Sequence, residues 1–144
     1  MKSIMKLVAM VITDPLDVVE IGSMSCEMGG AYSVKPLGVL SMIDDGELDW
    51  KLIAIRTDDP LADQLRDVDD IENGVVSGIR EWFRWYKVPD GKSPNTFGHD
   101  ERCLNASEAH EVIKETHESW RNLCEGKVDP GKLWVDRDLD LSKW

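Results

Sequence analysis

Aspartate and lysine side chains in the first third of the chain have the types and spacing that divalent-cation and phosphate chemistry requires. Asp14 and Asp17 lie on either side of a proline, and the run from Asp44 to Asp49 holds four acids in six residues. Carboxylate oxygens are the ligands that Mg²⁺ prefers in proteins. Lys51 follows Asp49 by two positions, so on a strand both side chains point to the same face. That face could carry a metal ligand beside a phosphate-binding ammonium.

Ordinary structural roles explain the same acids when only their spacing is considered. Asp14 and Asp17 could form a turn or capping pair. The run from Asp44 to Asp49 could be a solvated hairpin tip, and it lacks the ligand order of an EF-hand. Spacing therefore leaves a metal site and plain surface structure both open.

Two further candidates stand at the end of an aromatic segment, Trp82 to Lys87. Aromatic residues at helical spacing are usually core residues. The Tyr86 hydroxyl and the Lys87 ammonium, however, are donors that could hold a phosphate. The histidines have no metal spacing with one another or with a cysteine, and a surface or capping role is expected for each: His99, His110 and His117.

These side chains need a sheet and helices to bring them together. Period-two and apolar runs predict four strands, at Ile4–Ile12, Leu16–Ile21, Ala31–Ile43 and Trp50–Ile55. The turn Asp44-Asp45-Gly46 predicts a hairpin between the last two, because glycine accepts a positive φ. Gly38, in the middle of a strand, predicts a bulge or a bend.

Two helices are predicted after the strands. The first has Asp69 and Asp70 as capping residues and apolar positions from Ile71 to Tyr86. The second begins with a capping box formed by Asn105 and Glu108 and is stopped by Gly126. Strands followed by helices indicate an α+β fold, here a bent antiparallel sheet or partial β-barrel flanked by two helices.

Composition narrows the classes of protein to consider. The 144 residues suit one domain. The chain has 17 basic and 28 acidic residues and a net charge of −11, which repels nucleic acid and anionic membranes. No apolar run approaches the ~20 residues that span a bilayer. The three cysteines have no CxxC spacing, so neither a disulfide framework nor a zinc site is expected. Met1–Ile12 is interpreted as containing a strand rather than a signal peptide.

Five blocks of sequence indicate a protein family, which the spacing of single residues does not. They are DPLDVVEIG at 14–22, VKPLGVL at 34–40, DDGELDWKLIAI at 44–55, EWFRWYKVPDGK at 81–92 and KETHESW at 114–120. In this order and nearly without gaps, they resemble the soluble family I inorganic pyrophosphatases of the eukaryotic type. The resemblance covers most of the chain after Thr13 and implies the OB-like, partly closed barrel of that family.

The resemblance implies Mg²⁺-dependent hydrolysis of pyrophosphate to two phosphates, with Mn²⁺ as a second usable cation. It assigns the site to catalytic Asp14, to metal ligands Asp17, Asp44 and Asp49, and to substrate-binding Lys51, Tyr86 and Lys87. Asp14 corresponds to the acid that orients the nucleophilic water. The resemblance further implies a cytoplasmic homodimer whose partner is pyrophosphate, with no nucleic-acid or membrane partner.

The sequence also departs from the family pattern. The family motif begins with one more aspartate, and Ile12 stands at that position. A long section normally precedes the motif, and here only Met1–Thr13 does. We therefore expect a single pyrophosphatase-like domain over 1–144, incomplete at its N-terminus with 1–13 unmatched, and turnover far below that of a complete family member. A non-catalytic metal-binding relative, or a partner subunit of a full-length pyrophosphatase, is the alternative interpretation.

Overall fold

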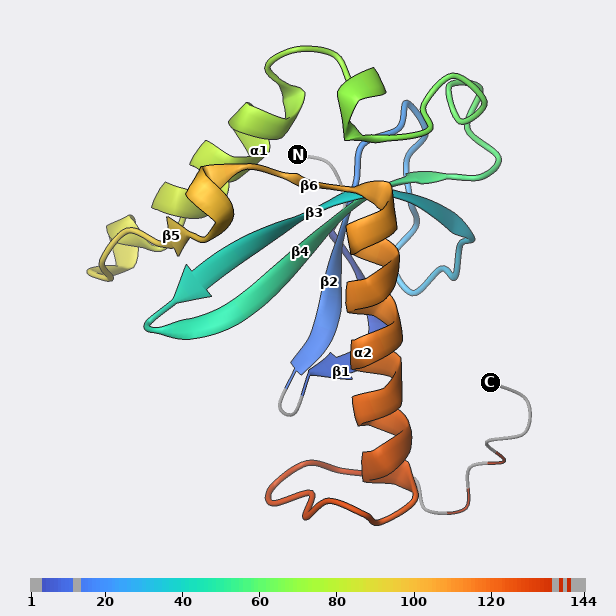
Figure 1. The fold of residues 1–144 in the computed structure, drawn as a ribbon, viewed down its shortest axis with the longest axis vertical. Coiled ribbons are helices and arrows are strands. Elements are labelled where there is room, and N and C mark those ends of the chain that lie inside the picture. Colours follow the sequence, from blue (N-terminus) through green and yellow to red (C-terminus); the bar gives the residue numbers. More distant parts are fainter. Residues whose placement is uncertain (1–3, 12–13, 136–137, 139, 141–144) are drawn as a thin grey trace.

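The computed structural model of the protein describes residues 4–11, 14–135, 138 and 140, and of residues 4–11 and 14 it describes the backbone (Figure 1). Strands precede helices along the chain, as the sequence predicts. The strands and α-helices are β1 (Ile4–Val11), β2 (Asp14–Glu20), β3 (Val34–Asp44), β4 (Glu47–Arg56), α1 (Val75–Trp85), β5 (Thr96–Phe97), β6 (Leu104–Asn105) and α2 (Ala106–Cys124). Short 3₁₀ turns are η1 (Val68–Asp70), η2 (Val88–Asp90) and η3 (His99–Glu101).

The strands form one bent, open sheet in the order β1-β2-β4-β3-β5, with β6 also paired to β3. The α+β prediction is confirmed. The sheet is not wholly antiparallel, however, because β2 and β4 run parallel. The loop after β2 returns the chain to the same end of the sheet, where Val34 opposes Arg56. Since β3 then runs opposite to β2 and β4 runs opposite to β3, β2 and β4 share one direction.

Both predicted irregularities of the β3–β4 hairpin are present. Asp45 and Gly46 have positive φ, 48° and 87°, as a tight two-residue turn requires. The pairing register shifts between Pro36 and Gly38. A Cβ atom at Gly38 would lie 2.7 Å from the Leu104 carbonyl oxygen, so the bulge also makes room for β6.

The two faces of the sheet carry separate apolar clusters, and one helix covers each face. Side chains alternate between the faces along β4. Ile53 and Ile55 pack with Phe83 of α1, whereas Leu52 and Ala54 pack with Ala109 and Val112 of α2. Figure 1 shows α2 running along β1 and β2, with α1 on the other side of the hairpin. Among the described residues, no helix is both long and apolar enough to cross a membrane.

The predicted start of the first helix is wrong. Asp70 joins Asp67 in a capping box that closes the short turn η1, and Ile71 follows in extended backbone. Helix α1 begins only at Val75, after Gly74. The local hydrogen bonds of the two acids stop the helix from extending across them. The second helix has the predicted capping box of Asn105 and Glu108.

Buried polar contacts around Gly22 join the ends of β2 and β4. The Glu20 carboxylate accepts hydrogen bonds from the Gly22 and Arg56 amides. Asp59, 4% exposed, accepts bonds from the Ser23 amide and hydroxyl. These hydrogen bonds hold the loop that follows β2 against the end of β4.

Candidate active site

Lys51 stands between Asp17 and Asp49 on the α1 face of the sheet. Its Nζ lies 2.7 Å from Oδ2 of each aspartate. The parallel pairing sets Asp17 opposite Lys51, and Asp49 is two residues earlier on β4, on the same face as predicted. The Lys51 side chain is 2% exposed, whereas Asp17 and Asp49 are 22% and 36% exposed. The two carboxylates thus converge on one buried cation and keep contact with solvent.

A second ion pair lies at the end of the hairpin. The Lys87 ammonium, just after α1, bonds to the Asp44 carboxylate at the end of β3. The hydrogen bond that Lys87 donates to Asp44 raises the pKa of Lys87 above its ordinary value, and Tyr86 adds to that effect. The Lys87 nitrogen lies 5.4 Å from the centre of the Tyr86 ring. Lys87 therefore reaches the hairpin, with the Tyr86 ring near its ammonium.

Phe83 connects the two ion pairs. The Lys51 nitrogen lies 5.2 Å from the centre of the Phe83 ring, close enough for a cation–π contact. The same ring meets Tyr86 edge-on, with 5.8 Å between centroids. Sequence reasoning assigned Phe83 to the core, and it is buried, but it also supports Lys51.

Six of the seven residues named from the sequence are thus gathered along one face, between the hairpin and α1. They are Asp17, Asp44, Asp49, Lys51, Tyr86 and Lys87. Of Asp14 the structure describes the backbone, which begins β2 three residues before Asp17. Ile12, at the position of the missing family aspartate, lies outside the described residues.

The donor types suit a hard divalent cation, because the carboxylates already converge on a positive charge and remain accessible to water. Within the described part of the chain, no three acids, histidines or cysteines are close enough together to form a metal cluster. Lys51 occupies the space between Asp17 and Asp49. Asp17 and Asp49 would hold such a cation through carboxylates that solvent can reach.

The histidines lie apart from this face. His99 Nδ1 lies 2.9 Å from the Ser41 hydroxyl, and its ring stacks on Trp50 at 6.1 Å. His117 contacts Trp120 on α2. The surface role expected for His99 agrees with its exposure, whereas His117 is half-buried.

The sequence profile of the inorganic pyrophosphatase family matches residues 13–121. The chain belongs to the inorganic pyrophosphatase family. Soluble inorganic pyrophosphatase 1, chloroplastic, of Chlamydomonas reinhardtii is 55% identical over 116 residues, which are 78% of this chain and 41% of that protein. The chain therefore spans about two fifths of the length of that pyrophosphatase.

Solved pyrophosphatase structures share the fold. The type I inorganic pyrophosphatase of Toxoplasma gondii is 57% identical with a TM-score of 0.75, over 76% of this chain and 49% of that one. The N-terminally truncated vacuolar soluble pyrophosphatase of Trypanosoma cruzi, solved in complex with PPi, is 41% identical with a TM-score of 0.75. That match covers 78% of this chain and 44% of the other. The predicted family and fold are confirmed.

Sequence reasoning missed a set of polar residues that hold the end of α1. Arg84 pairs with Glu101, and Asn95, 4% exposed, bonds to the Phe83 carbonyl oxygen. These contacts join segments whose separation along the chain has no regular period. A buried asparagine in a loop leaves no pattern in a single sequence, so no signal was available.

Proposed function

We propose that this chain carries a pyrophosphate-hydrolysing site on the α1 face of its sheet, within a single pyrophosphatase-like domain. The observation that carries the proposal is the convergence of Asp17 and Asp49 on Lys51, whose ammonium also contacts the Phe83 ring of α1. Carboxylates and ammonium groups on one face supply the two kinds of group that a metal–phosphate substrate requires.

Three carboxylates are proposed to hold the divalent cations, namely Asp17, Asp49 and Asp44. The cation is Mg²⁺, with Mn²⁺ as an alternative, because both prefer oxygen ligands. When bound, such a cation supplies charge neutralisation at the phosphate oxygens and makes a ligated water more acidic. Asp14 is proposed to orient the attacking water and to accept its proton.

Lys51, Tyr86 and Lys87 are proposed to donate hydrogen bonds to the phosphate oxygens. Charge builds on the attacking and leaving oxygens of a phosphoryl transfer, so donors already in position stabilise that charge. Lys51 is held by two carboxylates and Lys87 by one. These contacts orient both ammonium groups before substrate arrives.

The remaining proposals concern the substrate, the oligomeric state and the cellular location. The substrate is pyrophosphate, and the assembly is a homodimer. A cytoplasmic location stays a prediction, because relatives of comparable identity are named chloroplastic and mitochondrial. The net charge of −11 supports a protein without a nucleic-acid partner.

The test compares the native chain with Asp17→Asn, which keeps the size of the side chain and removes its charge. Calorimetry with Mn²⁺ should show weaker binding in Asp17→Asn, and phosphate release from pyrophosphate with Mg²⁺ should fall by roughly 10²-fold or more. The matched control is His110→Ala, an exposed change on α2, which should match the native chain in both assays. Equal Mn²⁺ affinity in native chain and Asp17→Asn would show that Asp17 is not a ligand.

A further inference from the structure

The η3 turn has a backbone conformation that L-amino acids rarely adopt. His99, Asp100 and Glu101 have φ values of 54°, 54° and 61°. Non-glycine residues in this left-handed region are individually uncommon, and three in succession are strained. Strain of this kind persists only where surrounding contacts enforce it, and it is found preferentially at functional sites.

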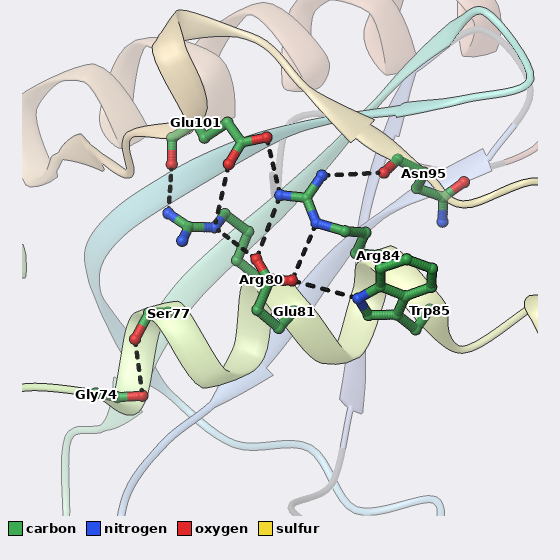
Figure 2. Close-up of polar contacts among 8 residues, drawn as sticks. All are labelled: Gly74, Ser77, Arg80, Glu81, Arg84, Trp85, Asn95 and Glu101. Carbon is green, nitrogen blue, oxygen red and sulfur yellow. Dashed lines mark hydrogen bonds and ion pairs between the residues drawn. The ribbon is translucent and has the colours of Figure 1, made fainter.

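Two arginines of α1 contact the last residue of this turn (Figure 2). The Arg80 guanidinium donates to the Glu101 carbonyl oxygen at 2.9 Å. Arg84 Nη2 lies 2.8 Å from the Glu101 carboxylate. Arg84 also bonds to Glu81 through Nε at 3.0 Å. We call these four residues, Arg80, Glu81, Arg84 and Glu101, the arginine clamp.

The end of α1 is held to β3 by a second connection. The Asn95 amide donates to the Arg84 carbonyl oxygen at 2.9 Å, and Asn95 Nδ2 donates to the Phe83 carbonyl oxygen at 2.9 Å. Asn95 therefore satisfies two carbonyls in the last turn of the helix. The next residues form β5, which pairs with β3 at Met42 and Ile43. Asp44 follows directly.

Arg84 links these two connections. Its guanidinium carbon lies 5.3 Å from the centre of the Phe97 ring of β5, and its side chain is 15% exposed. The hydrogen bond that Arg84 donates to Glu81, together with the contact to Glu101, raises the pKa of Arg84 although burial opposes it. Tyr86 and Lys87 follow Arg84 by two and three positions. The place of α1 relative to β3 thus sets the place of both donors.

We propose that Arg84 and Glu101 are positioning residues that hold Tyr86 and Lys87 against the Asp44 end of β3, so that the substrate donors are in place before pyrophosphate binds. The proposal rests on the proposed function of that site. In this arrangement the strained turn places the Glu101 carboxylate beside Arg84.

The test uses Arg84→Gln and Glu101→Gln, alone and together, with Arg84→Lys as the conservative variant. Amide hydrogen exchange should become roughly tenfold faster at Tyr86 and Asn95, because a charge-assisted hydrogen bond is lost. The double variant should have a smaller effect than the two single effects added together, since both single variants remove the Arg84–Glu101 contact. Arg84→Lys should recover part of the effect, because it keeps the charge and loses the planar fork.

Pyrophosphate binding supplies the second readout. We expect Kd, and KM if turnover is measured, to rise about tenfold in Arg84→Gln while kcat changes less, as for a loss of uniform binding. The control is Arg121→Gln, which removes an exposed arginine 3.8 Å from Glu125 on α2. It should leave exchange at the end of α1 and pyrophosphate affinity unchanged.

Several results would overturn the proposal. Exchange at Tyr86 and Asn95 could match the Arg121→Gln control, or it could rise equally at Leu52 and Ile53 in β4, which would indicate general destabilisation. Exchange could also rise at Tyr86 without any change in pyrophosphate affinity. If the native chain neither binds nor hydrolyses pyrophosphate, the proposed function fails, while the exchange pattern still decides whether the clamp holds the end of α1.

Discussion

Replacing Lys51 by methionine would isolate the buried ammonium between the two candidate metal ligands. Methionine keeps an unbranched apolar side chain above the Phe83 ring and removes the charge. Asp17 and Asp49 would then face each other without the cation that both contact at 2.7 Å. The stability of the variant therefore measures how much that cation contributes.

The magnitude follows from burial and geometry. Removing one partner of a buried ion pair costs about 3–5 kcal/mol in the free energy of unfolding. Asp17 and Asp49 keep 22% and 36% exposure, so water solvates part of their charge. We therefore expect Lys51→Met to lower the free energy of unfolding by about 2–4 kcal/mol without divalent cations.

Divalent cations should reverse part of this loss. If Asp17 and Asp49 are metal ligands, removing the neighbouring positive charge strengthens their attraction for Mn²⁺. Binding to the folded state alone stabilises by about 2.7 kcal/mol when the cation is at 100 times Kd. Lys51→Met should thus gain more stability from Mn²⁺ than the native chain does, although it loses a phosphate donor.

The assay is urea unfolding in EDTA and in Mn²⁺. Lys92→Met serves as the matched control, because Lys92 is 58% exposed and lies 3.9 Å from Asp45. It should unfold like the native chain in both solutions. The reasoning is refuted if Lys51→Met is as stable as the native chain in EDTA. It is refuted equally if Mn²⁺ stabilises Lys51→Met no more than Lys92→Met.

Of three further predictions, two concern the buried polar contacts around Gly22 and one concerns Gly78 in α1. A Cβ at Gly22 would lie 2.4 Å from Asp59 Oδ2, so Gly22→Ala should lower the free energy of unfolding by about 1–3 kcal/mol. Gly78→Ala, with open space around its Cβ and a helical position, should raise it by up to about 1 kcal/mol; chemical denaturation measures both. Burial would raise the pKa of Asp59, but hydrogen bonds from Leu61 and Ser23 outweigh it and lower the pKa. The stability that ionised Asp59 contributes is therefore complete above the ordinary aspartate pKa, and it is lost as the pH falls through the lower pKa of Asp59 in the folded protein. The native chain and Asp59→Asn should thus differ in thermal stability at pH 7 and converge below about pH 4.

Local features of the sequence determined much of the fold. The apolar runs predicted the four long strands to within a few residues. The positive φ at Gly46 and the capping box at Asn105 depend on residues at most three positions away. The shared face of Asp49 and Lys51 follows from the strand period. Such features are readable because neighbouring residues alone decide them.

Local competition explains where the sequence prediction failed. Asp69 and Asp70 precede an apolar pattern at helical spacing, so the sequence predicted that they cap the first helix. The capping box that formed instead uses Asp67 and Asp70 to close η1. In both arrangements an acidic side chain caps the start of a helix or turn. Which of the two forms depends on how the following Ile71 reaches the core.

Only the tertiary structure decided which charges meet. Asp17 and Lys51 are 34 positions apart and become neighbours because β2 and β4 pair in parallel at one register. Lys87 reaches Asp44 only because Asn95 and the arginine clamp set where α1 ends. Register and helix placement result from packing across the whole core, and a shift of one residue on a strand would turn these side chains to the opposite face. The sequence therefore determined the chemical types of the site, while the packing of the sheet against α1 determined their geometry.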